Sequence, residues 1–171
     1  MTNSAENFKN KLLAKEQAAQ NRTEELEKIR QNMLLVQQKK IETYQQYLPE
    51  LFKTLKQWSE AGGLKCCSIQ VGYYDYEKLY QAEGLMVTDG NKKVFFNPQG
   101  VSSGASFQGT VQIEMPTPQG FHQLYFGLST SKIAEQPTWL YVDYDSQNRQ
   151  PLQPKRITEE LFFDLMTKAF M

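Results

Sequence analysis

The chain has 171 residues, of which 40% are hydrophobic and 22% are charged, values typical of a globular protein that builds its core without metal or disulfide links. The 19 basic residues balance the 19 acidic ones, so the chain lacks the basic excess that dominates binding to nucleic-acid phosphates. No segment has the apolar length of a membrane span or of a secretion signal. We therefore expect a cytoplasmic protein with neither a nucleic-acid nor a membrane partner.

The first part of the chain is predicted to be a long helix. From about Ala5 to Trp58 there is no glycine, and Leu, Lys, Glu, Gln and Arg, which favour helices, prevail. Four apolar residues spaced three, four and three apart form a stripe on one helix face: Leu26, Ile29, Met33 and Val36. Because the surrounding sequence is too polar to hold an isolated helix more than marginally, another polypeptide should cover this stripe.

A second apolar set runs along the same helix, one residue out of register with the stripe. Its members keep heptad spacing with only Gln37 breaking it: Leu34, Ile41, Tyr44, Leu48, Leu51, Leu55 and Trp58. This offset is typical of a four-residue stutter, which turns the seam slightly around the helix. Pro49 removes a backbone hydrogen bond within the set, so we expect the helix to be kinked or broken near it. Gly62 and Gly63 should end the helix.

From Leu64 onwards apolar and polar residues alternate, which predicts a β-strand with one buried face. The expected core face carries Cys67, Ile69, Val71 and Tyr73. Adjacent residues of a strand point to opposite faces, so the neighbours Cys66 and Cys67 should not form a disulfide bond with each other. We interpret both as thiols, with Cys67 a small core residue and Cys66 on the other side.

Further strands follow with short turns between them. The segment from Leu85 to Phe96 is predicted to be a hairpin with a two-residue loop, since Asp89 and Gly90 suit a type I′ turn. That loop places four apolar residues on one face: Leu85, Val87, Val94 and Phe96. Three more strand-like segments follow, FQGTVQIEM, FHQLYFGL and WLYVDYD. Consecutive hairpins with one solvated face indicate an antiparallel sheet.

The end of the chain returns to helix. Thr158 suits the N-cap position, and Glu159 and Glu160 lie in the first turn, where the helix dipole favours acidic residues. A broad apolar face follows: Leu161, Phe162, Leu165, Met166, Ala169 and Phe170. We expect this face to pack on the sheet.

Two short patterns only partly match motifs that carry chemistry. GVSSG, Gly100 to Gly104, fits the G-x-S-x-G pattern of a nucleophile elbow, but an alternating strand follows where the elbow needs a helix. DYDSQN, Asp143 to Asn148, begins like a calcium loop but lacks its glycine and its glutamate. No P-loop or dinucleotide fingerprint occurs. The sequence therefore favours a protein with no catalytic residue, no metal site and no cofactor.

The stretch GYYDYEKLY brings four tyrosines together. In strand geometry Tyr74 and Tyr76 fall on the face opposite the core, and Trp139 and Tyr141 join them if their strand turns the same way. An exposed patch of these four rings would suit a protein partner, because Tyr and Trp are favoured at interfaces. The alternative is that a helix covers the rings as a second core layer.

The sequence thus predicts an α+β protein with a helical arm (residues 1–40) and a globular domain (residues 41–171). In this domain an antiparallel meander of about five to seven strands packs against the rest of the long helix and the C-terminal helix. The uncovered stripe predicts a non-enzymatic interaction module, of adaptor, scaffold or inhibitor type, that forms a homodimer or binds another protein. The alternative is a small-molecule-binding module or enzyme whose pocket between sheet and helix is lined by Tyr74, Tyr76, Trp139 and Tyr141.

Overall fold

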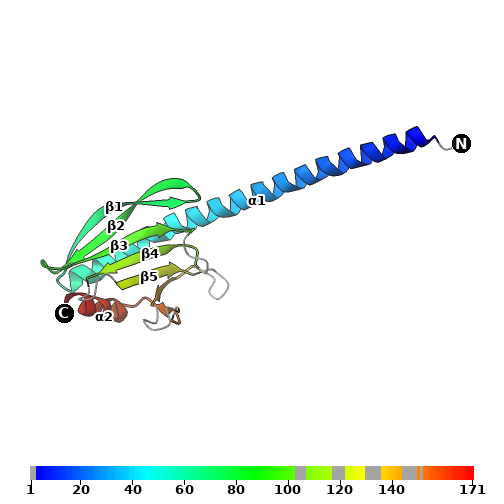
Figure 1. Cartoon of the computed structure of the whole chain (residues 1–171). Helices are drawn as coiled ribbons and strands as arrows, with labels where there is room; N and C mark the ends of the chain where they lie inside the picture. The colour runs from blue at the N-terminus through cyan, green and yellow to red at the C-terminus, as the bar shows by residue number, and fades with distance from the viewer. Residues whose placement is uncertain (1–2, 103–106, 117–121, 130–135, 144–149, 151) are drawn as a thin grey trace. The chain divides into compact units, whose positions relative to one another are not determined.

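The computed structural model describes residues 3–102, 107–116, 122–129, 136–143, 150 and 152–171. Its contacts divide the chain into two units, Met1–Lys39 and Lys40–Met171. The elements are α1 (Ser4–Ala61), β1 (Lys65–Asp75), β2 (Lys78–Thr88), β3 (Lys93–Gly100), β4 (Thr110–Met115), β5 (His122–Leu128), β6 (Trp139–Val142), β7 (Lys155–Arg156) and α2 (Glu159–Phe170). The predicted α+β class, with a long N-terminal helix, an antiparallel sheet and a C-terminal helix, is confirmed (Figure 1).

Helix α1 continues through Pro49 without a break. A proline has no N–H group, so the carbonyl of Gln45 lacks the donor that a helix usually supplies four residues later. After Ala61 the chain turns sharply: Gly62 donates its N–H to the carbonyl of Trp58 (3.0 Å), and Gly63 has a φ of 79°. The left-handed conformation at Gly63 is the glycine helix end that the sequence predicts.

The seven strands found in the described residues form one antiparallel sheet in the order β1-β2-β3-β4-β5-β6-β7, so each strand pairs with the next along the chain. Buried apolar residues of these strands, the second apolar set of α1 from Ile41 onwards and the buried face of α2 share one core. Tyr44, Leu55, Phe96, Phe126 and Phe162 are among its fully buried side chains. Helix α2 begins as predicted, since the Thr158 side chain accepts the N–H of Leu161 (3.1 Å).

The turn between β2 and β3 is longer than predicted. Thr88 pairs with Lys93, which leaves a loop of four residues, Asp89 to Lys92, in place of two. The carboxylate of Asp89 accepts the N–H groups of Asn91 (2.9 Å) and Lys92 (2.8 Å), and these bonds stabilise the longer loop and lower the pKa of Asp89. Two extra residues leave the side-chain alternation unchanged, so the predicted apolar face survives, with Leu85 opposite Phe96 and Val87 opposite Val94.

The prediction of which cysteine faces the core was wrong. Cys66 is half-buried and packs against the core, whereas Cys67 is exposed; both are thiols. Cys66 lies opposite the core residue Val87. Further along β1 the core-facing residue is Tyr73, an odd-numbered position, whereas strict alternation from Cys66 would place even-numbered positions on the core face. The long β1–β2 hairpin twists, so the side of the strand that faces the core changes along its length.

A buried hydrogen-bond network links α1 to the sheet. The hydroxyl of Tyr44 donates to the carbonyl of Thr110 (2.8 Å) and accepts the N–H of Gly100 (3.3 Å). Beside it, the buried carboxylate of Asp75 accepts the N–H groups of Val101 (2.9 Å) and Ser102 (3.0 Å). Gly100 has a φ of 85°, and a Cβ atom there would collide with this carboxylate, so only glycine fits. We call these residues the Tyr44 network.

Removing one hydroxyl from the Tyr44 network should destabilise the protein. Tyr44→Phe keeps the buried ring but deletes both of its hydrogen bonds, so we expect the free energy of unfolding in urea to fall by about 1–3 kcal/mol. Tyr76→Phe, at an exposed ring, is the control and should change it little. Equal stability of the two variants would show that the Tyr44 hydroxyl contributes nothing to folding.

Alkaline pH should weaken the fold through its buried tyrosines. Burial and then the charge of Asp75 raise the pKa of Tyr73 from 10.0 to about 12. Between these pH values the unfolded chain releases this proton more readily than the folded one, so stability is lost as pH rises, by up to about 2 kcal/mol for this residue. Burial raises the pKa of Tyr44 in the same direction.

Unfolding in urea at a series of pH values from 9 to 12 measures this loss. Tyr73→Phe should show a shallower decline than the wild type, whereas Tyr74→Phe, at an exposed ring, should follow the wild-type curve. A Tyr73→Phe curve parallel to the wild type would contradict the raised pKa.

Candidate functional site

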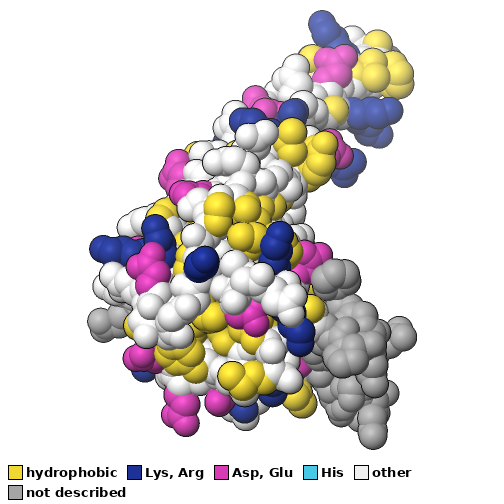
Figure 2. All heavy atoms as spheres, turned by 90° about the vertical axis from the view of Figure 1, so that its left-hand side faces the viewer, with side chains coloured by type: hydrophobic (Ala, Val, Ile, Leu, Met, Phe, Trp, Pro, Cys, Tyr) yellow, Lys and Arg dark blue, Asp and Glu magenta, His cyan; other side chains and the backbone are white. Residues whose placement is uncertain are grey.

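All four residues of the predicted stripe lie exposed on the unit Met1–Lys39. Their exposed fractions are 60% for Leu26, 55% for Ile29, 57% for Met33 and 56% for Val36. Figure 2 shows hydrophobic side chains interspersed with charged ones along this helix. Large apolar side chains that are more than half exposed and follow one helix face are unusual for a surface that stays in water.

The stripe is longer than the sequence pattern indicated. Counting back from Leu26 and Ile29 by sevens reaches Leu12 and Phe8, and both are exposed, at 45% and 64%. We define the arm seam as the positions of this phase: Ala5, Phe8, Leu12, Lys15, Ala19, Arg22, Leu26, Ile29, Met33 and Val36. The heptad spacing of Phe8 and Leu12 is present in the sequence, but Lys15 and Arg22 interrupt the apolar pattern between them and Leu26.

Other exposed apolar residues of this helix lie outside the seam. Leu13, Leu34 and Leu35 are exposed at 54%, 54% and 68%. Leu34 has the phase of the second apolar set, whose later members from Ile41 onwards are buried in the globular unit. These off-seam residues are useful controls because they have the same chemistry on a different helix face.

The four predicted aromatic residues do not form one exposed patch. Tyr74 is 68% exposed and Tyr76 is 38% exposed, but Tyr141 is buried at 6%. Trp139 is half-buried: its indole N–H donates to the carbonyl of Tyr47 (3.1 Å), and its ring lies 6.1 Å from that of Tyr44. Strand β6 therefore directs its aromatic residues into the core, as the alternative interpretation of these rings expects for this pair.

The exposed pair of tyrosines lies at the tip of the β1–β2 hairpin. Tyr74 pairs with Leu79, which is 52% exposed, so an apolar cross-strand pair faces solvent there. Tyr76 is part of the turn and not of a strand, because Asp75 pairs with Lys78. Tyr76 and Glu77 have φ angles of 50° and 67°. Residues other than glycine, Asn and Asp rarely adopt this left-handed backbone conformation.

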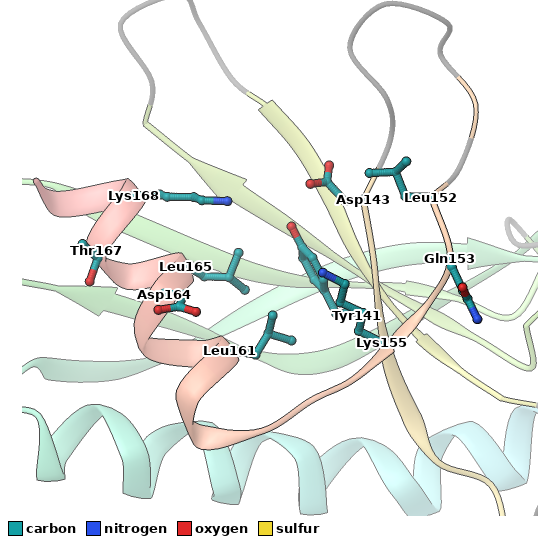
Figure 3. Close-up of a pocket in the computed structure, with 10 residues that line it drawn as sticks. All are labelled: Tyr141, Asp143, Leu152, Gln153, Lys155, Leu161, Asp164, Leu165, Thr167 and Lys168. Carbon is teal, nitrogen blue, oxygen red and sulfur yellow. The ribbon is translucent and has the colours of Figure 1, made fainter.

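A pocket of about 390 Å³ lies among β6, β7 and α2 (Figure 3). Tyr141 and Leu165 line its buried part, and Lys168 extends from α2 toward Tyr141. Burial and the neighbouring charge of Asp143, which bonds to its hydroxyl, raise the pKa of Tyr141. Of the four rings predicted to line a pocket, Tyr141 is the one that lines this pocket.

The two motif-like patterns lie only partly within the residues that the structure describes. Ser102 of GVSSG donates its hydroxyl to Asp75 (2.9 Å), while residues 103–106 lie outside the described residues. Residues 144–149 of the calcium-like pattern lie outside them as well. Within the described ranges no three His, Cys, Asp or Glu side chains gather as metal ligands, and no helix has the length and apolarity to cross a membrane.

Comparisons with protein-family models, with curated proteins and with solved structures found no match to this chain. The arm seam, the hairpin tip and the pocket are therefore judged on their own geometry.

Replacing the strained turn should stabilise the protein. Asn-Gly is the preferred pair for two left-handed residues in a two-residue hairpin, so we expect Tyr76→Asn combined with Glu77→Gly to raise the free energy of unfolding by about 1–2 kcal/mol. Unfolding in urea measures the gain, with Tyr76→Phe as the control for loss of the hydroxyl. A loss of stability in the double variant would mean that the Tyr76 side chain supports the fold more than its backbone strains it.

Proposed function

We propose that this chain is a non-enzymatic protein–protein interaction module that recognises another helix through the arm seam. The observation that carries the proposal is the exposure of six large apolar side chains in one heptad phase: Phe8, Leu12, Leu26, Ile29, Met33 and Val36. Transferring such side chains out of water is favourable by about 25 cal/mol per Å² of apolar area. A partner helix that covers the seam gains this free energy and also stabilises the arm.

The mechanism of this module is recognition by buried apolar anchors. Each seam residue inserts between residues of the facing helix, and the polar residues beside the seam then select the partner. The globular unit contributes a second exposed surface at the hairpin tip, where Tyr74 and Leu79 lie opposite each other. A protein with these features acts as an adaptor, a scaffold or an inhibitor, and itself forms a homodimer or binds another protein.

An acidic residue placed in the seam should abolish assembly. Ile29→Asp sets a charge among apolar anchors, so we expect the oligomer measured by size-exclusion chromatography with light scattering to become a monomer. Leu35→Asp is the matched control: it makes the same change at a more exposed residue, 68% against 55%, on another face. It should leave assembly unchanged.

Two outcomes would contradict self-association through the seam. Equal loss of assembly in both variants would mean that general weakening of the helix, and not the seam, is responsible. A wild-type chain that stays monomeric at high concentration would remove self-association, and the seam would then have to serve a different protein.

The pocket beside Tyr141 supports a second candidate function, the binding of a small molecule. Its lining combines the apolar side chains Leu161 and Leu165 with two lysines, Lys155 and Lys168, and two aspartates, Asp143 and Asp164, a combination that suits an amphiphilic ligand with a zwitterionic group. A thermal-shift screen of such compounds tests it, since a ligand that prefers the folded state raises the unfolding midpoint. The shift should shrink in Lys168→Ala and persist in the control Lys53→Ala; a screen without a shift counts against the pocket.

A further inference from the structure

We infer that the partner of the arm seam is a second copy of this chain, aligned parallel and in register. This inference rests on the proposed function and specifies the occupant of the same surface. The information lies in the residues that flank the seam. In a heptad written a to g, with the seam at a and d, residues at g and e lie beside the seam and meet their counterparts on the partner helix.

In a parallel pair, each g residue approaches the e residue five positions later on the other helix. With Leu12 and Leu26 at a positions, this brings Lys11 to Glu16 of the second copy and Glu25 to Arg30 of the second copy. Each of these attractive pairs occurs twice because the dimer is symmetric. The remaining flanking pairs contain no like charges: Ser4 with Lys9, Ala18 with Thr23 and Asn32 with Gln37.

Antiparallel alignments use the same residues less well, because g then meets g and e meets e. The alignment in which all ten seam positions overlap pairs Ala5 with Val36; it brings no opposite charges together and sets Lys9 against Arg30 of the second copy. A shift by one heptad, which pairs Leu12 with Val36, brings Glu16 to Arg30 but sets Glu25 against Glu25 and Lys11 against Lys39. A shift by two heptads brings no opposite charges together, and a shift by three gives Glu25–Lys39 pairs but sets Arg30 against itself. All three shifts leave Phe8 outside the overlap of the two seams.

The parallel alignment also has a cost at Lys15 and Arg22, which occupy d positions and face their own counterparts. Their long side chains can lie along the seam with the charged ends in water, which is easier in a two-stranded assembly than in a larger one. A charged residue in the seam lowers stability but fixes the register and the number of strands. The same two residues thus favour a dimer over a trimer or tetramer.

Charge reversal on the full-length chain tests the alignment. We expect Glu25→Lys alone, and Arg30→Glu alone, to raise the dimer dissociation constant on the order of tenfold, since each turns two attractive pairs into two repulsive ones. The double variant reverses both charges, and in the parallel register it should return close to the wild-type value. Glu24→Lys, one residue away and facing away from the seam, is the matched control and should change the constant little.

A thiol cross-link reads the orientation independently. In a chain with Cys66→Ser and Cys67→Ser, Arg22→Cys places two introduced thiols face to face only if the helices are parallel and in register. Oxidation should then give a covalent dimer on a denaturing gel, whereas Lys28→Cys, on the outer face, should not cross-link.

The outcomes separate this inference from the function on which it rests. A wild-type chain that never dimerises overturns both the self-association and the alignment. A dimer that disperses with Ile29→Asp, but neither recovers in the charge-reversed double variant nor cross-links at position 22, keeps the proposed function and overturns the parallel register. A trimer or tetramer in light scattering also overturns it.

Discussion

An apolar side chain stabilises a protein only when something covers it, and this constraint divides helix α1 into two parts. From Ile41 to Leu55 the second apolar set is buried in the core of the globular unit, and Trp58 packs half-buried against it. Before Lys40 six large apolar residues follow a phase offset by one residue and are exposed. The second part of α1 therefore completes the core of the globular unit, whereas the apolar residues of its first part remain exposed. The proposed function follows from this exposed part.

Much of the architecture could be predicted because it depends on patterns that survive small errors in the loops. The alternation of Val111, Ile113 and Met115 places them in the core whatever turn precedes β4. The loop of Asp89 has two residues more than predicted, yet its flanking strands keep the predicted faces, because an even change preserves parity. The N-cap at Thr158 depends on a short-range hydrogen bond and was predictable for that reason.

The failures involve features that no local pattern encodes. The turn at Tyr76 and Glu77 lacks the residues typical of left-handed backbone, so no local pattern marks the end of β1 at Asp75. The faces of Cys66 and Cys67 depend on the accumulated twist of a long hairpin. The burial of Tyr141 depends on which elements pack over β6, and this tertiary packing cannot be read from the local sequence. The sequence predicted the seam from Leu26 to Val36 but not its extension to Phe8, because Lys15 and Arg22 interrupt the apolar pattern.

The order of the strands has a consequence for how the chain reaches its fold. Because every strand pairs with its neighbour in sequence, the sheet can grow hairpin by hairpin with little loop-closure entropy at each step. The bond from Tyr44 to Thr110 joins residues 66 positions apart, so it can form only after several hairpins exist. Docking of the helix is then the step of highest contact order, and we expect it to limit the folding rate. Because the contacts of a rate-limiting docking step form in the transition state, substitutions at Tyr44 should slow folding more than substitutions in the turns.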